Sequence, residues 1–408
     1  MRIIGLDMHR AFAEAVALED GVYKRIGRIG MTRDHLRAFA ETLHPTDHVI
    51  VEATGNATAV LEILAPKVER VAVANPFQVH LIARAKTRTD KIDARVLAQL
   101  YAAGFLPEVW IPDEAPLARR RQVTRRNQLV KSRVRLKLIA QSILHAPLGP
   151  RCPHADLFGG KGRAWMLAQK LPDDERAAIV SHLAECDRQT EALKLVERDI
   201  AEVALDDVSV KRLMTIPGID MVVAVGVMAA IGRIDRFASP DKLVAYFGLT
   251  PSVRQSGDGP ARHGRISKRG RSHARHLLVE AAWQTVRNPG PMRAFYERVK
   301  GRRGPHVAAV AVARKLAVPT WHMLTKGEDY AWGRPALMAR KLRSLELTAG
   351  KPARNGQKGS AYDDTLPERR RAEREQVEQS GRAYRRLTEH WRRQGSQKGA
   401  GAANEERR

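Results

Sequence analysis

Two acidic residues three positions apart, Asp90 and Asp93, lie within Lys86–Arg95 and begin a stretch with helical periodicity through Tyr101. Residues i and i+3 of a helix share a face, about 5–6 Å apart, so two carboxylates there repel each other unless a cation lies between them. Hard divalent cations such as Mg²⁺ take oxygen ligands of this kind. Thr89 can also cap the helix, and acids in a first turn suit the helix dipole. The pair alone leaves a metal site and ordinary capping equally open.

The preceding residues predict elements that can bring further acids to the same point. Residues 2–29 read as three strands in succession, and helices then alternate with strands at 48–52 and 70–74. This β-β-β-α-β-α-β-α order predicts a mixed sheet with helices on both faces. Asp7 and Glu52 each end an apolar strand. Reactive groups in such sheets gather at strand ends where the strand order reverses, so neighbouring strands would make these two acids adjacent.

Three short motifs carry these acids: Gly-Leu-Asp-Met-His around Asp7, Val-Glu-Ala-Thr-Gly around Glu52, and Thr-Asp-Lys-Ile-Asp-Ala around Asp90 and Asp93. Each alone is typical of a capped turn at a strand or helix end. Together, in this order, they resemble the DEDD tetrad of RuvC-like, ribonuclease-H-fold nucleases, and in particular the DEDD transposases of the insertion-sequence family called "IS one-ten". The resemblance implies a RuvC-like catalytic domain over residues 1–110 whose four acids hold one or two Mg²⁺ ions.

A basic helical region is expected over residues 111–206. Acidic residues are absent from Leu117 to Ala155, and apolar residues recur at helical spacing, which predicts a long helix over 113–145. A helix over 173–206 would pair with it as a hairpin, within or between chains. A solvated charged face is the alternative, but the lack of acids favours contact with phosphates, including those of an RNA. The residues expected to bind nucleic acid are Arg119, Arg120, Arg121, Arg125, Arg126, Lys131, Arg133 and Arg135.

Residues 207–332 read as a second, mostly helical domain. A short helix, the Pro217-Gly218 turn and an apolar helix over 221–231 form a helix-hairpin-helix pattern. Such a turn can present backbone N–H groups to a DNA phosphate without reading sequence, which makes Gly218 a candidate for DNA contact. An ordinary helical hairpin is the alternative.

A basic loop around Ser256-Gly257 resembles the carboxy-terminal domain of the same family, in which a serine of the Ser-Gly loop is the catalytic nucleophile. Ser256 matches that serine, and Ser252 ranks lower because no glycine follows it. A serine hydroxyl is a weak nucleophile that needs activation and nearby positive charge. A flexible phosphate-binding loop with an incidental serine is the alternative. The residues that can supply positive charge are Arg254, Arg262, Arg265, Lys268, Arg269 and Arg271. Four of them are expected to bind nucleic acid: Arg254, Arg265, Lys268 and Arg269.

Composition favours a polyanionic partner. The 408 residues include 71 Lys and Arg against 45 Asp and Glu, a net charge of +26, which indicates nucleic acid before an anionic membrane surface. No apolar run is long enough for a membrane span, and no signal peptide is expected. The two cysteines, Cys152 and Cys186, fit a reducing cytoplasm. The resemblance to the insertion-sequence family further implies a bacterial protein that associates with the nucleoid. Residues 333–408 read as a charged tail, disordered or with a fraying helix around 366–392.

The resemblance implies a DNA transposase or recombinase that cuts and rejoins donor and target DNA through a covalent phosphoserine link. It further implies that acids and serine come from different protomers of a homodimer or homotetramer, and that a structured guide (bridge) RNA pairs with the DNA. Two alternatives stay open. A metal-dependent Holliday-junction-type nuclease would hydrolyse with water and not need Ser256. A non-catalytic nucleic-acid-binding protein would need neither the acids nor the serine.

Overall fold

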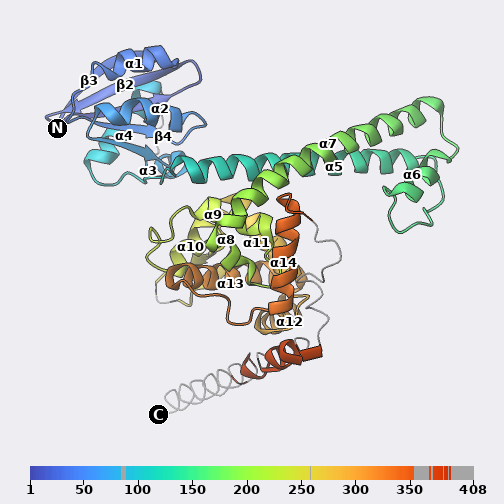
Figure 1. The fold of residues 1–408 in the computed structure, drawn as a ribbon. Helices are drawn as coiled ribbons and strands as arrows, with labels where there is room; N and C mark the ends of the chain where they lie inside the picture. Colours follow the sequence, from blue (N-terminus) through green and yellow to red (C-terminus); the bar gives the residue numbers. More distant parts are fainter. Residues whose placement is uncertain are drawn as a thin grey trace, which may run out of the picture. The chain divides into compact units, whose positions relative to one another are not determined.

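The computed structural model describes residues 1–83, 89–257, 259–352, 367–368, 371–379, 381–384 and 386. The Lys86-Thr87-Arg88 part of the first acidic stretch lies outside these residues, as do residues 353–366 and 387–408 of the expected tail. The chain divides into two compact units, Met1–Pro112 and Asp113–Arg408 (Figure 1). Within the described ranges, no helix has the length and apolar character that crossing a membrane requires.

Unit 1, Met1–Pro112, is a mixed five-stranded sheet with helices on both faces, which confirms the expected element order. The strand order is β3-β2-β1-β4-β5. The first three strands pair antiparallel, while β1, β4 and β5 run parallel, so the order reverses beside β1 and β4. The elements are β1 Ile3–Met8, β2 Phe12–Glu19, β3 Val22–Gly30, α1 Arg33–Ala40, β4 His48–Glu52, α2 Ala57–Leu64, β5 Arg70–Ala74, α3 Pro76–Ile82 and α4 Asp90–Ala102.

Strand alternation divides the side chains of the sheet between two cores. Leu6 and Val51 face one side and pack with residues of α1 and α2. Ile3 and Ile50 face the other side and pack with residues of α3 and α4. Because the side-chain period of a strand is two, Asp7 follows Ile3 onto the α4 side, and Glu52 follows Ile50. Both strand-end acids therefore face the helix that carries Asp90 and Asp93.

Unit 2, Asp113–Arg408, begins with a long antiparallel hairpin of α5 (Glu114–His145) and α7 (Asp173–Asp206), labelled in Figure 1. Both helices follow the expected bounds, and the pairing lies within one chain. Arg126 and Glu197 form an ion pair of 2.7 Å across the hairpin. Between the two long helices, residues 160–167 form α6 (Gly160–Leu167), whose Met166 is buried in a cluster with Leu144 of α5 and Leu183 of α7.

The rest of unit 2 is mostly helical, with one small two-stranded sheet. The helices pack around α9, whose apolar residues are almost all buried, as its composition predicts. The elements are α8 Val208–Met214, α9 Met221–Ile231, α10 Pro240–Tyr246, β6 Pro251–Arg254, β7 Arg262–Ile266, α11 Ser272–Thr285, α12 Pro291–Arg303, α13 Pro305–Lys326 and α14 Pro335–Thr348.

Helix α14 corrects the expectation that a disordered tail begins at residue 333. Half of its residues 335–348 are apolar, and Ala336 and Leu345 are buried against the rest of unit 2. Further along, a helical segment over 371–379 is anchored by Glu373, which accepts a hydrogen bond of 2.6 Å from Arg334. Buried apolar residues of α14 and the Arg334–Glu373 contact thus order part of this region.

The Pro217-Gly218 turn joins α8 and α9, and its glycine is packed against α11. Gly218 has a φ of +91°, and a Cβ atom there would lie 2.5 Å from the backbone nitrogen of Thr285. The Thr285 hydroxyl donates a hydrogen bond of 2.7 Å to the Pro217 carbonyl oxygen. Close packing and left-handed backbone thus require glycine here for structural reasons. Contact of Gly218 with DNA stays a prediction.

Lys341 of α14 holds the same turn through its ammonium group. Burial lowers the pKa of Lys341 to about 8, with Arg340 acting in the same direction and Asp220 opposing. The Nζ atom donates hydrogen bonds of 2.6 to 2.8 Å to three backbone carbonyl oxygens, those of Met214, Ile216 and Ile219. A single side chain therefore satisfies acceptors that the turn itself leaves without helical partners.

We expect Lys341→Met to lower the free energy of unfolding by about 3 kcal/mol, because buried carbonyls lose their donor. Urea denaturation followed by circular dichroism measures the change. The matched control is Arg340→Met, an exposed neighbour on the same helix, which should stay within about 0.5 kcal/mol of the unmodified chain. Equal stability of Lys341→Met and the control would contradict this role for Lys341.

Candidate metal centre and serine loop

Asp7 and Glu52 lie side by side at the ends of two parallel strands. Strands β1 and β4 pair in parallel with Leu6 opposite Val51, so the next residue on each strand is one of these acids. The Asp7 residue is only 8% exposed, whereas Glu52 is half-buried. The two strands are neighbours, which is the condition under which the two acids become adjacent.

Helix α4 brings the other two acids to the same edge of the sheet. Thr89 caps this helix, because its side-chain oxygen accepts a hydrogen bond of 3.3 Å from the Ile92 N–H. Gly5 lets the helix lie directly on β1, since a Cβ atom at this position would be 2.0 Å from the Ala94 carbonyl oxygen. Asp90 and Asp93 occupy the first turn of α4. Close packing of α4 on β1 therefore places them beside Asp7.

Three of the expected acids, Asp7, Glu52 and Asp93, line one cavity of about 170 Å³. The remaining lining residues come from α3, α4 and the segment after α3: Pro76, Val79, His80, Ala83 and Val96. Asp90 lies at the edge of this group and is connected through His9. The His9 Nε2 atom is 3.2 Å from Asp7 Oδ2 and 3.3 Å from Asp90 Oδ1. The four acids thus form one connected set.

The electrostatics of this set favour a bound cation. Burial raises the pKa of Asp7, the charges of Asp93 and Asp90 raise it further, and His9 opposes them. The Arg28 guanidinium of β3 lies 3.8 Å from Asp90 Oδ2. Candidate ligand atoms of Asp7, His9 and Asp90 lie within 4.8 Å of one another. Carboxylate oxygens with one imidazole nitrogen fit a divalent metal ion, which would relieve the repulsion that raises the Asp7 pKa.

Sequence reasoning missed His9 and Arg28 as members of this group. His9 stands two positions after Asp7, so an extended chain places both side chains on the same side of the strand. This spacing within the Gly-Leu-Asp-Met-His motif could have identified His9 as a neighbour of Asp7. Arg28 reaches Asp90 from β3, an element that nothing in the sequence connects with α4.

We expect His9→Ala to weaken Mn²⁺ binding by about tenfold or more, because an imidazole that contacts two carboxylates either binds the ion or positions its ligands. Electron paramagnetic resonance of free Mn²⁺ during a titration measures the affinity. The control is His44→Ala, an exposed histidine in the loop after α1. Unchanged or tighter Mn²⁺ binding by His9→Ala would show that His9 does not support the metal site.

The serine loop of unit 2 connects the antiparallel strands β6 and β7. Ser256 is exposed in this loop, while the neighbouring Asp258 lies outside the described residues. The competitor Ser252 lies within β6, where its hydroxyl donates a hydrogen bond of 3.2 Å to the Arg265 carbonyl oxygen across the hairpin. Ser252 thus has a structural partner across the hairpin, and the role of Ser256 as a nucleophile stays a prediction.

The base of this hairpin is fixed to the end of α10. Gly270 has a φ of +145°, and a Cβ atom there would lie 2.2 Å from the Tyr246 carbonyl oxygen. The Lys268 N–H donates a hydrogen bond of 3.1 Å to the Gly248 carbonyl oxygen. A rigid base thus carries an exposed loop surrounded by cations. The exposed basic residues are Arg254, Arg262, Arg265, Lys268 and Arg269.

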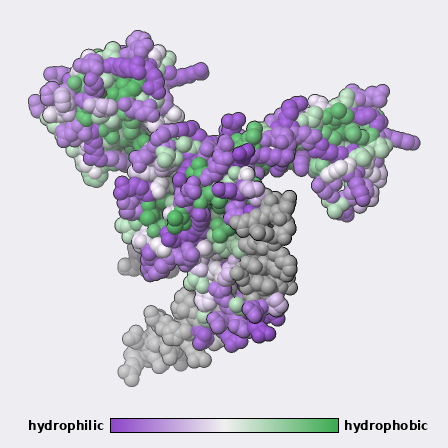
Figure 2. All heavy atoms as spheres, viewed as in Figure 1, coloured by the Kyte–Doolittle hydropathy of each residue, from purple (hydrophilic) through white to green (hydrophobic). Residues whose placement is uncertain are grey.

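The arginines of α5 divide into two groups. Some hold the fold: Arg119 pairs with Asp207 at 2.6 Å, and Arg120 donates hydrogen bonds to the carbonyl oxygens that end α9. Arg126 and Arg133 also contact α7. The exposed group can reach a polyanion and consists of Arg121, Arg125, Lys131 and Arg135. Figure 2 shows a mostly hydrophilic surface along this hairpin, with an apolar patch near α6.

Comparison with known proteins gives matches in both units. A profile of DEDD transposases of the IS110 type matches residues 4–146, and one described as the transposase IS116/IS110/IS902 family matches residues 210–297. A Sinorhizobium fredii protein named as a transposase, y4qE, is 34% identical over 208 residues, which cover 50% of this chain and 49% of the relative. The Coxiella burnetii transposase for insertion sequence element IS1111A is 33% identical over 147 residues, covering 35% and 40%. The chain thus spans half or less of the length of these relatives.

Proposed function

We propose that this chain, which belongs to the transposase IS116/IS110/IS902 family, cuts and rejoins DNA at the ends of an insertion sequence, using a divalent-metal site in unit 1 and a serine nucleophile in unit 2. One observation carries the proposal: Asp7, Glu52 and Asp93 line a single cavity, and His9 connects Asp90 to Asp7. Acids from three separate elements, distant in sequence, converge as the DEDD interpretation requires.

A RuvC-like fold for unit 1 is part of this proposal. The strand order β3-β2-β1-β4-β5 and the acids at the ends of β1 and β4 support it. Asp7, Glu52, Asp90 and Asp93 would hold one or two Mg²⁺ ions. A bound Mg²⁺ supplies polarisation of the scissile phosphate and stabilisation of the leaving oxygen. Asp7 contributes as a ligand only when ionised, and its raised pKa means that it gains most from a nearby cation.

Ser256 would form the covalent link. Its oxygen forms a bond to the scissile phosphorus, the bond from phosphorus to one deoxyribose oxygen breaks, and the hydroxyl proton passes to a base in the site. One phosphodiester link to DNA is exchanged for one to Ser256, so no bond energy is lost to hydrolysis. A DNA hydroxyl can therefore attack the phosphoserine link in the reverse reaction and rejoin the strand. Exposed cations of the serine loop, such as Arg254 and Arg265, are placed to neutralise the phosphate.

The proposal includes the remaining partners. The acids and Ser256 would come from different protomers of a homodimer or homotetramer, and a guide (bridge) RNA would select donor and target DNA by base pairing. The exposed cations Arg121, Arg125, Lys131 and Arg135 support phosphate contact along α5. Localisation with nucleoid DNA in the bacterial cytoplasm would follow from these partners.

Strand exchange in a purified system tests the proposal. The full chain is incubated with DNA that carries the element ends, a target DNA and the RNA transcribed from the element. We expect recombinant products in Mg²⁺ and none after chelation of divalent ions. Products that form equally well in the presence of chelator, or none under any metal and RNA condition, would count against it.

A further inference from the structure

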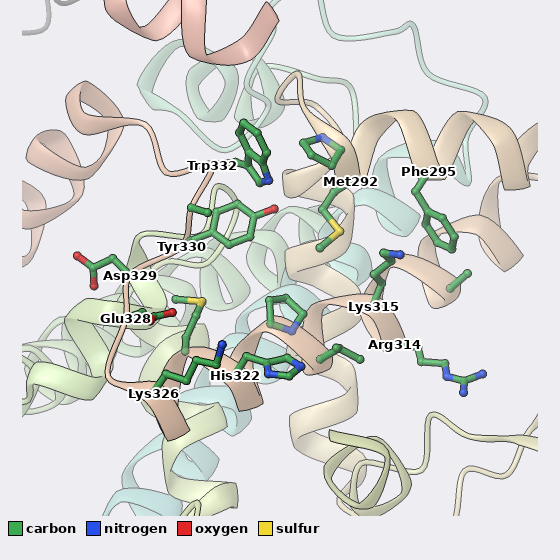
Figure 3. A pocket seen from close by; sticks show the side chains of 16 residues that line it. Met292, Phe295, Arg314, Lys315, His322, Lys326, Glu328, Asp329, Tyr330 and Trp332 are labelled. Carbon is green, nitrogen blue, oxygen red and sulfur yellow. The ribbon is translucent and has the colours of Figure 1, made fainter. Parts of the chain in front are cut away.

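A cavity of about 650 Å³ lies within unit 2, formed by α12, α13 and the segment after α13 (Figure 3). Its volume is within the range of about 300–1,000 Å³ that is usual for ligand sites. The proposed metal site and serine loop make no use of it. Its polar and aromatic lining residues are Phe295, Arg314, Lys315, His322, Lys326, Glu328, Asp329, Tyr330 and Trp332.

Aromatic side chains form opposite walls of the cavity. Figure 3 shows Tyr330 and Trp332 on one side and Phe295 on the other, with Met292 between them. The Lys315 Nζ atom lies 5.0 Å from the centre of the Phe295 ring. Aromatic faces with adjacent cations are the arrangement on which nucleobases stack while their phosphates are neutralised. The chemistry of these walls therefore suits a nucleotide.

Among the described residues, neither Arg314 nor Lys315 of this cavity forms an ion pair with a carboxylate. Burial lowers the pKa of Lys315, and the nearby Arg298 lowers it further. Asp329 also lines the cavity, but its carboxylate lies 3.8 Å from Arg212 Nε and turns away from the centre in Figure 3. A half-buried cation without an acidic partner gains stability from a bound anion such as phosphate.

The aromatic wall of Tyr330 and Trp332 is built into the fold. The Tyr330 N–H donates a hydrogen bond of 3.0 Å to the Thr215 hydroxyl oxygen. Arg334, two residues after Trp332, donates to Asn288 Oδ1 at 3.0 Å. Since the wall is ordered by contacts outside the cavity, a stacked base would meet a preorganised surface.

The cavity also offers a carboxylate as a hydrogen-bond acceptor for the edge of a base. Glu328 lies at the rim with an exposed side chain. Such acceptors can take hydrogen bonds from the exocyclic amino group of a base.

We propose that this cavity binds one unpaired nucleotide of single-stranded DNA, with its base between Phe295 and the Tyr330–Trp332 wall and its phosphate on Arg314 and Lys315. DNA is the polymer on which a transposase acts, and strand exchange separates the strands of its substrate. The site would hold a displaced strand while the ends are exchanged. This inference does not depend on which residues perform the cutting.

Fluorescence anisotropy of the full chain with a labelled short oligothymidylate tests the site. The control ligand is an abasic strand of equal length, which keeps the sugar-phosphate backbone and lacks the bases. We expect the unmodified chain to bind the oligothymidylate about fivefold or more tighter than the abasic strand. Trp332→Ala should abolish this difference. Lys315→Gln should weaken binding of both strands, and more so than Arg302→Gln, an exposed charge-matched control on α12.

Photo-crosslinking of unmodified chain to a bromodeoxyuridine-containing strand, mapped by mass spectrometry, locates the contact even where a variant fails to fold. Crosslinks to Phe295, Tyr330 or Trp332 support the proposal. Crosslinks confined to other surfaces, or equal affinity of the unmodified chain for thymidylate and abasic strands, would overturn it. Tighter binding of oligouridylate than of oligothymidylate, if Trp332→Ala removes the difference, would assign the cavity to RNA and likewise overturn the DNA assignment.

Discussion

Asp7→Asn is expected to reduce strand exchange by at least about a hundredfold. Mutation of a residue that only contacts a metal ligand already lowers metal affinity or activity by about 10–100-fold, and Asp7 is proposed as a ligand itself. Asp7 is the most buried of the four acids and contacts both the cavity and His9. Without its charge, the site would offer one ligand fewer to a divalent ion, whose proposed role is to stabilise the leaving oxygen. Recombinant product measured per unit time in Mg²⁺ reports the loss.

The folded state should survive this substitution. Burial and the charges of Asp93 and Asp90 raise the Asp7 pKa, so the metal-free protein is under electrostatic repulsion that an amide removes. The melting temperature of metal-free Asp7→Asn should therefore equal or exceed that of the unmodified chain. Asp34→Asn, at an exposed acid in the first turn of α1, is the control and should retain activity. Full activity of Asp7→Asn would contradict the metal-site assignment.

Ser256→Ala is expected to eliminate the covalent protein–DNA adduct, because removal of a nucleophile costs several orders of magnitude in rate. The adduct is measured as radiolabelled DNA that stays with the protein after denaturation and electrophoresis. Ser252→Ala is the matched control, because Ser252 belongs to the same hairpin and its hydroxyl is bonded to the Arg265 carbonyl oxygen. It should retain adduct formation.

The same pair of variants separates the main alternatives. A junction nuclease that hydrolyses with water would continue to cleave DNA when Ser256 is alanine. Loss of the adduct in Ser252→Ala and retention in Ser256→Ala would reverse the assignment of the nucleophile. If the chain only binds DNA, no adduct will form with the unmodified chain or with either serine variant.

The fold of unit 1 was largely predictable, because its strands are short apolar runs separated by clear turn residues. The acids at the ends of β1 and β4 follow directly from that pattern. His9 shows the limit of such reasoning: its spacing from Asp7 was visible, but its contact with Asp90 depends on how closely α4 packs over Gly5. Tertiary packing of this kind is not encoded in local periodicity.

Unit 2 was less predictable in its charged segments. Long helices such as α5 were evident from periodicity, but periodicity cannot tell which arginines face a partner helix. Arg119 and Arg120 have the same local sequence signal as the exposed Arg121, yet they contact Asp207 and the end of α9. Helix α14 was missed although half of its residues are apolar, because it begins a charged carboxy-terminal segment and its buried contacts come from distant elements.

The most direct test of the account is a Mn²⁺ titration of the metal-free full chain, followed by electron paramagnetic resonance. If Asp7, Glu52, Asp90 and Asp93 share a metal site, the unmodified chain will bind one or two ions, and Asp7→Asn and Asp93→Asn will each lower the affinity by about tenfold or more, while Asp34→Asn will not. Equal Mn²⁺ affinity in all four proteins would contradict the claim that these acids converge on a common ion.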